Sequence, residues 1–370
     1  MIYIPILKNR KWELKSVDNV KVCFSDEIIP LFEIINDTYE KRYQIDPETG
    51  KIRTEKEICK TGLVRNKKVE KEPTEEDIIT LMDLSSKING KKMFADFFRY
   101  HIDEYHSKNV KTSALNLSRR LLDDEYYVKR IKGCLEFENI IPVISLKPKL
   151  CLSKEKIEEL IELAHNNGKM IAIRIETGLL DTYKDMLEGL WKEDYLLVDI
   201  RHNYIDSKIM ELEDLQGYDI DAKKILLNSP KDEVLYNTQY EEDGLTELID
   251  NSARERYQEF GLDGYGDYAG VADKLPLRSG GITGSATILM YRYDVNQFEV
   301  FRNPDSSLGM NGYIKVYEDV MRAENRLNID KDCIAYEVLH KSQKSIRSWG
   351  FWAGICITRY IHQIYKYIQK

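Results

Sequence analysis

The chain has 370 residues, of which 42% are hydrophobic and 32% charged, and its formal net charge is −8. The apolar content is too high for a disordered chain, and the charge content is too high for a membrane protein. The acidic balance disfavours a general nucleic-acid binder, although a basic groove inside an acidic protein stays open.

Three further features bear on the compartment. The six cysteines contain no CxxC pair, which excludes the common zinc-ribbon and thioredoxin-like motifs. The first 14 residues become charged at Lys8, too early for a secretory signal. The apolar run 349–358 is much shorter than the ~20 residues of a membrane span. We therefore expect a cytoplasmic protein with buried thiols and no membrane partner.

Eight short apolar runs recur along the chain, and most of them do not alternate with polar residues. Strands that are buried on both faces have this pattern. Amphipathic stretches separate the runs, and the one at 157–164 follows a candidate N-cap at Ser153. Further helical patterns cover 207–215 and 246–260. The runs are 3–7, 28–35, 92–98, 140–146, 170–175, 195–200, 224–227 and 264–269.

Eight strand candidates that alternate with helices predict a parallel sheet. Their number favours closure into a TIM-barrel-like (β/α)8 fold of the α/β class over an open doubly wound sheet. No G-x-G-x-x-G follows any run, which argues against a dinucleotide-binding domain. We predict that the barrel covers residues 1–275.

Two regions interrupt this alternation. Residues 37–77 carry mixed charge and a turn signal at 46–50, so we predict an insertion after the second strand. It is either a partner-binding arm or a solvated excursion. Residues 276–370 follow the eighth strand as an extension packed on the barrel. Their pattern predicts a hairpin of 286–293 with 298–302, then helices at 313–327, 332–339 and 348–368.

In a barrel, the working face is built at the C-terminal ends of the strands. Charged groups interrupt or close the apolar runs there, and buried charges are costly unless they are paired or ligated. They form either a candidate catalytic cluster or structural ion pairs. An error of one residue in a predicted strand register would turn the side chain to the outside of the barrel. The cluster consists of Lys8, Glu33, Asp96, Arg174, Asp199 and Asp267, with Ser145, Glu176, Arg201 and Asn228 beside it.

The predicted strand positions suggest two possible ligand sites. Carboxylates in the cluster are the ligands that Mg²⁺ takes, so a magnesium site is one alternative and neutralisation by Lys8 and Arg174 is the other. A Gly-rich segment follows the eighth strand, where barrels often bind phosphate. Its candidate phosphate-binding residues are Arg278, Gly280 and Gly281, unless the segment is only a flexible crossing into the hairpin.

Several segments resemble the phage-type beta protein family, which occurs in phages, prophages and bacterial defence islands. They are IPILK and WEL within 4–14, IIPLFEI at 28–34, IPVI at 141–144, GYGDYA at 264–269, MYRY at 290–293 and the aromatic tail near Trp349. The tail departs from the family, because one histidine, His362, stands where the family has a pair. The resemblance implies a modified barrel and a part in the conflict between bacteria and phages. It assigns no catalytic residue, although Lys8, Glu33 and Asp267 lie in matching motifs.

Two hypotheses of function follow. The first is an antiphage-defence component that recognises a phage product or holds an operon-encoded effector, using the insertion and the C-terminal helices. The alternative is a barrel enzyme, with or without Mg²⁺, that acts on a phosphorylated small molecule or a nucleotide. In it, a carboxylate would be the general base, and Lys8 or Arg174 would neutralise developing charge. The sequence leaves open whether the chain is an enzyme, and nucleic-acid binding ranks below both hypotheses.

Overall fold

The computed structural model describes residues 1–58, 62–101, 110–229, 240, 243–246, 249–276 and 285–369. The chain divides into two units, which we treat separately. One unit consists of Met1–Asn36 with Lys87–Lys370, and the other is Asp37–Ser86. None of the helices in the described ranges combines the length and the apolar character needed to cross a lipid bilayer.

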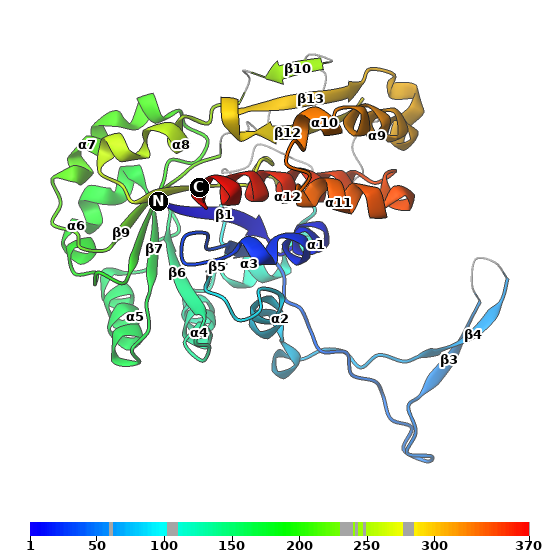
Figure 1. Cartoon of the computed structure of the whole chain (residues 1–370). Coiled ribbons are helices and arrows are strands. Elements are labelled where there is room, and N and C mark those ends of the chain that lie inside the picture. Colours follow the sequence, from blue (N-terminus) through cyan, green and yellow to red (C-terminus); the bar gives the residue numbers. More distant parts are fainter. Residues whose placement is uncertain are drawn as a thin grey trace. The chain divides into compact units, whose positions relative to one another are not determined.

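The first unit contains a closed barrel of eight parallel strands that pair in chain order (Figure 1). This confirms the predicted TIM-barrel-like (β/α)8 fold, and each predicted apolar run overlaps a barrel strand. The runs are continuously apolar because the strands are covered on both faces. The strands are β1 (Ile2–Lys8), β2 (Leu31–Ile34), β5 (Met93–Phe97), β6 (Ile140–Leu146), β7 (Ala172–Glu176), β8 (Tyr195–Asp199), β9 (Lys223–Leu227) and β11 (Gly264–Asp267).

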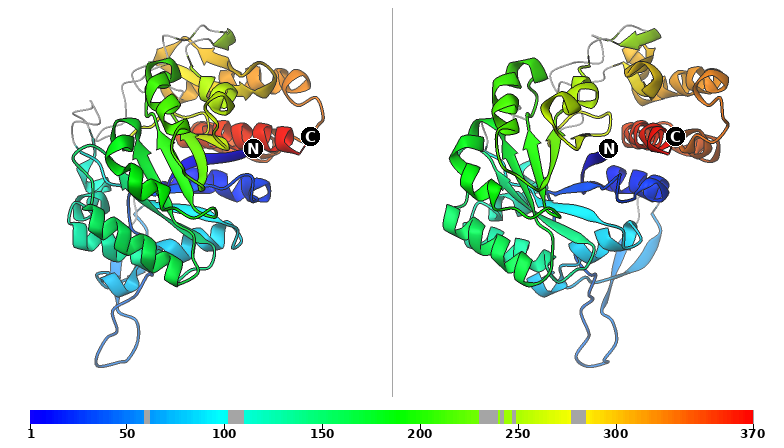
Figure 2. Two further views of the ribbon diagram at one scale, coloured as in Figure 1. Left: turned by 90° about the vertical axis from the view of Figure 1, so that its left-hand side faces the viewer. Right: turned by 60° about the vertical axis from the view of Figure 1, so that its left-hand side comes forward.

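Helices lie around the outside of this barrel (Figure 2). Helix α5 shows why they form: Ser153 caps its N-terminus by accepting a hydrogen bond from the backbone N–H of Lys156. Its apolar side chains, Ile157 and Leu160 among them, are buried along one face. The helices are α1 (Lys11–Val20), α3 (Asn116–Arg120), α4 (Asp124–Cys134), α5 (Lys154–Asn166), α6 (Leu180–Glu188), α7 (Ile209–Gln216) and α8 (Ser252–Arg256).

The C-terminal part of the same unit is a small antiparallel sheet with four helices. The predicted hairpin is present as β12 (Ala286–Arg292) and β13 (Gln297–Asn303). A third strand, β10 (Asp243–Thr246), pairs with β13, so the helix expected from residue 246 begins only at Ser252. Pairing with a strand far along the chain leaves no local pattern. The helices are α9 (Tyr313–Arg322), α10 (Glu324–Leu327), α11 (Ile334–Lys341) and α12 (Trp349–Ile368).

Helix α12 joins this C-terminal part to the barrel. It packs against α1 and β12, and Figure 1 shows it beside β1. Trp352, on its N-terminal half, is 1% exposed and stacks on Tyr313. Tyr360, on its C-terminal half, contacts the ring of Tyr3 from β1. The last helix of the chain therefore covers the part of the barrel wall where β1 meets β11.

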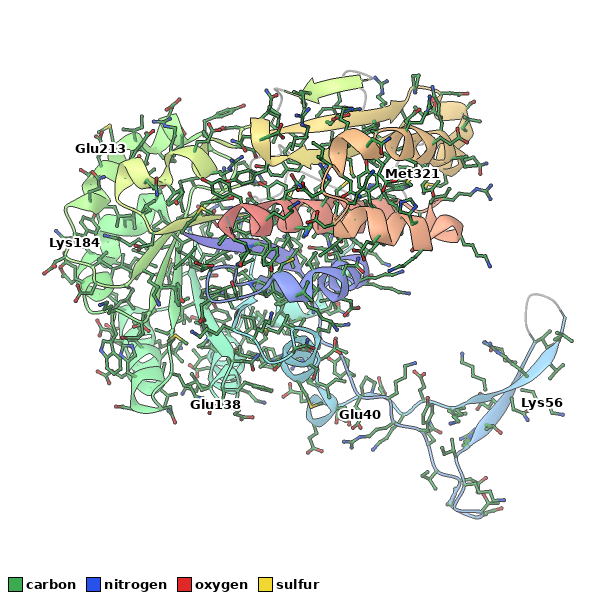
Figure 3. The ribbon with its side chains drawn as sticks, viewed as in Figure 1. Glu40, Lys56, Glu138, Lys184, Glu213 and Met321 are labelled. Atoms are coloured by element: carbon green, nitrogen blue, oxygen red, sulfur yellow. The ribbon has the colours of Figure 1, made fainter. Side chains whose placement is uncertain are left out.

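The second unit contains a two-stranded antiparallel sheet, β3 (Thr54–Ile58) with β4 (Val64–Lys68), and most of helix α2 (Thr80–Lys87). The turn signal at 46–50 is a turn in which Asp46 accepts hydrogen bonds from the N–H groups of Glu48 and Thr49. Every residue of β3 and β4 is exposed except Glu57, which is half-buried. Side chains, such as that of Lys56, extend from both sides of this sheet (Figure 3).

Candidate functional site

The inward-facing positions of the barrel strands end in a layer of polar side chains. Every second residue of a strand faces the interior. On β1, Ile4 and Ile6 belong to the barrel core and Lys8 follows them. Five of the six predicted cluster residues meet in this layer, and each is 4% exposed or less. The layer consists of Lys8 (β1), Glu33 (β2), Asp96 (β5), Ser145 (β6), Arg174 (β7) and Asp199 (β8).

Arg174 forms the centre of this layer. Its Nη1 lies 2.8 Å from Glu33 Oε1 and 2.9 Å from Asp96 Oδ2. Its Nε and Nη2 lie 2.9 Å and 2.7 Å from one oxygen of Asp199. Ser145 Oγ donates a hydrogen bond to the other oxygen of Asp96 at 2.8 Å. One planar guanidinium thus pairs with carboxylates from three other strands.

Lys8 forms a second centre next to the first. Its Nζ pairs with Glu33 and lies 2.6 Å from Asp273 Oδ1. It also lies 4.7 Å from the centre of the Tyr268 ring, whose hydroxyl donates to Glu33 Oε1 at 2.8 Å. Asp273 and Tyr268 were not among the site residues predicted from the sequence. Asp273 follows the eighth strand in a loop, and its only signal was an acidic residue directly after Val271 and Ala272.

The charges in this layer determine the protonation of its carboxyl groups. Burial raises the pKa of Glu33, but the charges of Lys8 and Arg174 outweigh burial and lower that pKa to about 2. Burial is likewise outweighed at Asp199, whose pKa is lowered by Arg174 and Arg201. The pKa of Asp273 is lowered by Lys8 and Arg201 in the same way. These carboxylates are ionised at neutral pH, and their lowered pKa makes them poor general bases.

Asp267 does not join the cluster, contrary to our expectation. It precedes Tyr268, which packs in the barrel interior, so Asp267 faces the outside of the wall. There it accepts hydrogen bonds from Tyr3 Oη at 2.9 Å and from Tyr360 Oη, on α12, at 2.5 Å. Burial raises the pKa of Asp267 to about 6. Like Asp199, it is an aspartate at the end of a strand. Unlike Asp199, it lies one residue away from an inward-facing position, so its side chain is on the other face.

Asp199 and Asp267 each form the same kind of turn, at the ends of two different strands. Asp199 accepts a hydrogen bond from the N–H of Arg201 at 2.8 Å, and Asp267 accepts one from the N–H of Ala269 at 2.9 Å. Arg201 and Ala269 both have left-handed backbones, with φ of +57° and +49°. Such φ values are strained for residues other than glycine, and such strain clusters at functional sites. Both strained residues lie at the strand ends where barrel enzymes place their chemistry.

Of the two alternatives for the carboxylates, the magnesium site does not fit the geometry of the layer, in which the carboxylates pair with Lys8 and Arg174. Three of its four candidate ligands, Glu33, Asp96 and Asp199, converge on the guanidinium of Arg174, which occupies the position between them. The fourth, Asp267, bonds instead to Tyr3 and Tyr360. Within the described ranges, no group of His, Cys, Asp or Glu residues has an arrangement that would hold a metal ion. The candidate phosphate loop cannot be placed, because its residues lie outside the described ranges: Arg278, Gly280 and Gly281.

The groups at the edge of the layer are more accessible. The side chain of His202 is 30% exposed, and its Nε2 lies 3.8 Å from Asp273 Oδ2. The side chain of Arg201 is 11% exposed, and its Nη2 lies 3.5 Å from the same oxygen. Any ligand that reaches the layer from the side of β8 would meet these two side chains first.

No protein-family model and no curated protein matches the sequence of this chain. The geometry therefore carries the functional argument. Two structural features bear on function. One is the buried network of ion pairs at the C-terminal ends of the barrel strands, and the other is the exposed two-stranded sheet in the other unit.

Proposed function

We propose that the chain is an interaction protein in which the barrel is a rigid scaffold. The observation that carries this proposal is the exposure of the β3–β4 sheet. A two-stranded sheet is marginally stable in water unless something packs on it. Three apolar side chains at its closed end are exposed: Ile58 by 74%, Leu63 by 71% and Val64 by 60%. These features suit a segment that binds a protein partner, either by packing on the apolar end or by adding a strand.

The buried layer of the barrel supports the same proposal. Lys8 and Arg174 are paired with carboxylates, and Glu33, which bridges them, is fully buried. Removing one member of a buried ion pair is costly because the other charge is left uncompensated. A network of this kind holds neighbouring strands together whether or not the barrel has a substrate.

We further propose that the partner belongs to the conflict between bacteria and phages, either a phage product or an operon-encoded effector. This part of the proposal rests on the resemblance of the first 35 residues and of the GYGDYA segment to the phage-type beta protein family. The acidic composition of the chain agrees with a protein partner more readily than with nucleic acid.

The experiment combines phage plating with a surface variant. The triple variant Ile58→Ser, Leu63→Ser, Val64→Ser should lose protection against phage and copurification of the partner, with its melting temperature unchanged. The matched control is Met210→Ser on helix α7 of the other unit, where the side chain is 76% exposed, and it should retain both properties. Full protection by the triple variant would overturn the proposal.

A second function, a barrel enzyme acting on a phosphorylated small molecule or a nucleotide, is favoured by one observation. The strained backbones of Arg201 and Ala269 lie at strand ends, and His202, which follows Arg201 in the sequence, is 30% exposed. In that case Arg201 would neutralise the substrate's phosphate. The double variant Arg201→Gln, His202→Asn should then abolish phage protection while the triple variant of the β3–β4 sheet retains it. The reverse result favours the interaction protein.

A further inference from the structure

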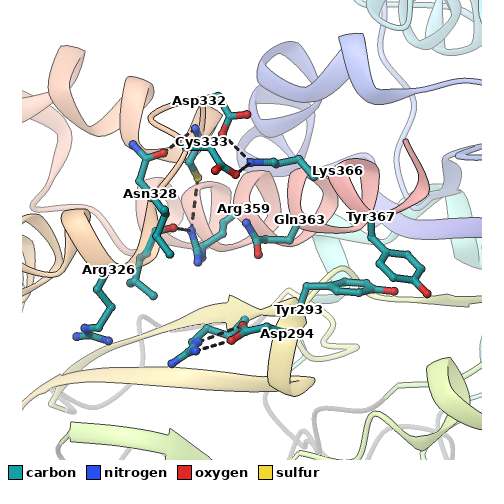
Figure 4. Close-up of a pocket in the computed structure, with 14 residues that line it drawn as sticks. Tyr293, Asp294, Arg326, Asn328, Asp332, Cys333, Arg359, Gln363, Lys366 and Tyr367 are labelled. Carbon is teal, nitrogen blue, oxygen red and sulfur yellow. Dashed lines mark hydrogen bonds and ion pairs between the residues drawn. The ribbon is translucent and has the colours of Figure 1, made fainter. Parts of the chain in front are cut away.

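A pocket of about 290 Å³ lies in the C-terminal part of the first unit. It is bounded by helix α12, the connection between β12 and β13, and the segment between α10 and α11 (Figure 4). Its volume is just below the roughly 300 Å³ at which the range for small-molecule sites begins, so it suits a small ligand. Figure 4 shows Arg359 and Gln363 extending from α12 into this space, with the rings of Tyr293 and Tyr367 at one side.

Arg359 is the unusual residue of this pocket, because its side chain is buried and it forms no direct ion pair, although its charge helps to lower the pKa of Asp294 across the pocket. The residue is 2% exposed. Its Nε donates to the carbonyl of Tyr291 at 2.8 Å, and its Nη1 donates to the carbonyl of Leu327 at 3.0 Å. Its third contact is with the thiol of Cys333 at 3.5 Å. All three acceptors are neutral. Within the described ranges, no carboxylate lies within ion-pair distance of Arg359, and Nη2 takes part in none of its hydrogen bonds.

The other cations of the pocket differ from Arg359 in this respect. Lys366 lies 2.9 Å from Asp332 Oδ1, and Arg292 lies 2.5 Å from Asp294 Oδ2. Arg326 pairs with Glu299. Asp294 is already paired with Arg292, and a buried charge without a direct partner is costly, so the arrangement favours an anion bound at Arg359.

We propose that this pocket binds a small organic anion whose carboxylate or phosphate group pairs with Arg359. A guanidinium presents a fork of N–H groups that matches either kind of oxyanion. Gln363 lies one helical turn from Arg359 on the same face of α12 and would add an amide donor. The rings of Tyr293 and Tyr367, stacked 4.2 Å apart, form an apolar wall for the body of the ligand. This inference is independent of the proposed interaction with a phage product or effector.

The test is isothermal titration of the full chain with two probes, inorganic phosphate and succinate, at constant ionic strength in sodium chloride. The proposal expects one saturable site for at least one probe, and the probe that binds distinguishes a phosphate ligand from a carboxylate ligand. The decisive variant is Gln363→Glu, which puts a carboxylate at the i+4 position from Arg359. This internal counter-ion should weaken probe binding at least about tenfold, equivalent to about 1.4 kcal/mol. It should also raise the melting temperature.

The matched control is Gln258→Glu, which adds the same charge at an exposed position of the same unit. It should change the dissociation constant less than about twofold, since surface charges are screened by salt. Two results would overturn the proposal. One is the absence of binding of both probes up to about 10 mM. The other is binding by Gln363→Glu that equals that of the unchanged chain.

Discussion

Arg174 binds one oxygen of Asp199, Oδ2, through both Nε at 2.9 Å and Nη2 at 2.7 Å. The two residues come from neighbouring parallel strands, in which Arg174 is paired with Leu197 and Asp199 lies two residues farther along. The third nitrogen of the guanidinium, Nη1, reaches Glu33 and Asp96 on β2 and β5. Arg174 therefore links the carboxyl ends of four strands of the barrel.

Replacing Arg174 by Met should lower the free energy of unfolding by about 3–5 kcal/mol, since it leaves buried carboxylates without their cation. Urea unfolding followed by circular dichroism measures this loss. Arg174→Lys keeps the charge without the planar fork and should cost less than Arg174→Met. A loss below about 1 kcal/mol for Arg174→Met, the value typical of a surface pair, would contradict the central role of this residue.

Asp267 should make the stability depend on pH in one particular direction. Its folded pKa of about 6 lies above the ordinary value of 3.8, so the native state holds the proton more tightly than the unfolded state. The stabilisation from this proton is complete below pH 3.8 and is lost as the pH rises through about 6. The loss amounts to about 3 kcal/mol. In Asp267→Asn, this fall between about pH 4 and pH 6 should disappear.

Unfolding in urea at several pH values tests the Asp267 prediction. The difference in unfolding free energy between Asp267→Asn and the unchanged chain should grow in favour of the variant from pH 4 to pH 7. Tyr360→Phe, which removes one hydrogen bond to the carboxylate, is the control. It should raise the pKa of Asp267 further, because that bond lowers it. A difference that is constant with pH would refute the assignment.

Glu33 should act in the opposite direction and at lower pH. Its folded pKa of about 2 lies below the ordinary 4.5, so its contribution is complete above pH 4.5 and is lost as the pH falls through about 2. Glu33→Gln should be less stable than the unchanged chain at pH 7, and the gap should shrink as the pH falls below 4.5. Acid unfolding curves of the two proteins measure this gap. Parallel curves down to pH 2 would show that Glu33 is not paired as described.

Gly264 should not tolerate a side chain. It pairs with Ile2 where β11 meets β1, and an added Cβ would lie 2.0 Å from the backbone oxygen of Ile2. Because neither strand can move without opening the barrel, Gly264→Ala should cost about 3 kcal/mol or more. Gly133→Ala in helix α4 is the matched control, since its added Cβ meets no described atom within 4 Å. It should be neutral or stabilising by up to about 1 kcal/mol. Thermal unfolding compares the two, and equal melting temperatures would contradict this account.

Local patterns in the sequence were sufficient to predict the barrel. The continuously apolar runs, the cap at Ser153 and the turn at Asp46 act over a few residues, so their structure is specified locally. The same runs predicted five of the six cluster residues, since a charged side chain in a strand that is buried on both faces must lie where it can be paired. The alternation could also have excluded Asp267, because Tyr268 next to it was the better inward-facing residue.

Other features depend on contacts between distant parts of the chain, and no local pattern specifies them. The strand β10 exists because it pairs with β13, about 50 residues later in the sequence. Asp273 reaches Lys8 across the closure of the barrel, and Arg359 becomes a buried charge without a carboxylate only when α12 packs on the sheet. The amino-acid sequence by itself determined which segments become strands and helices and therefore the class of the fold. Only the tertiary structure decided which charges are paired, because pairing is set by distances in space that strand closure and helix packing create.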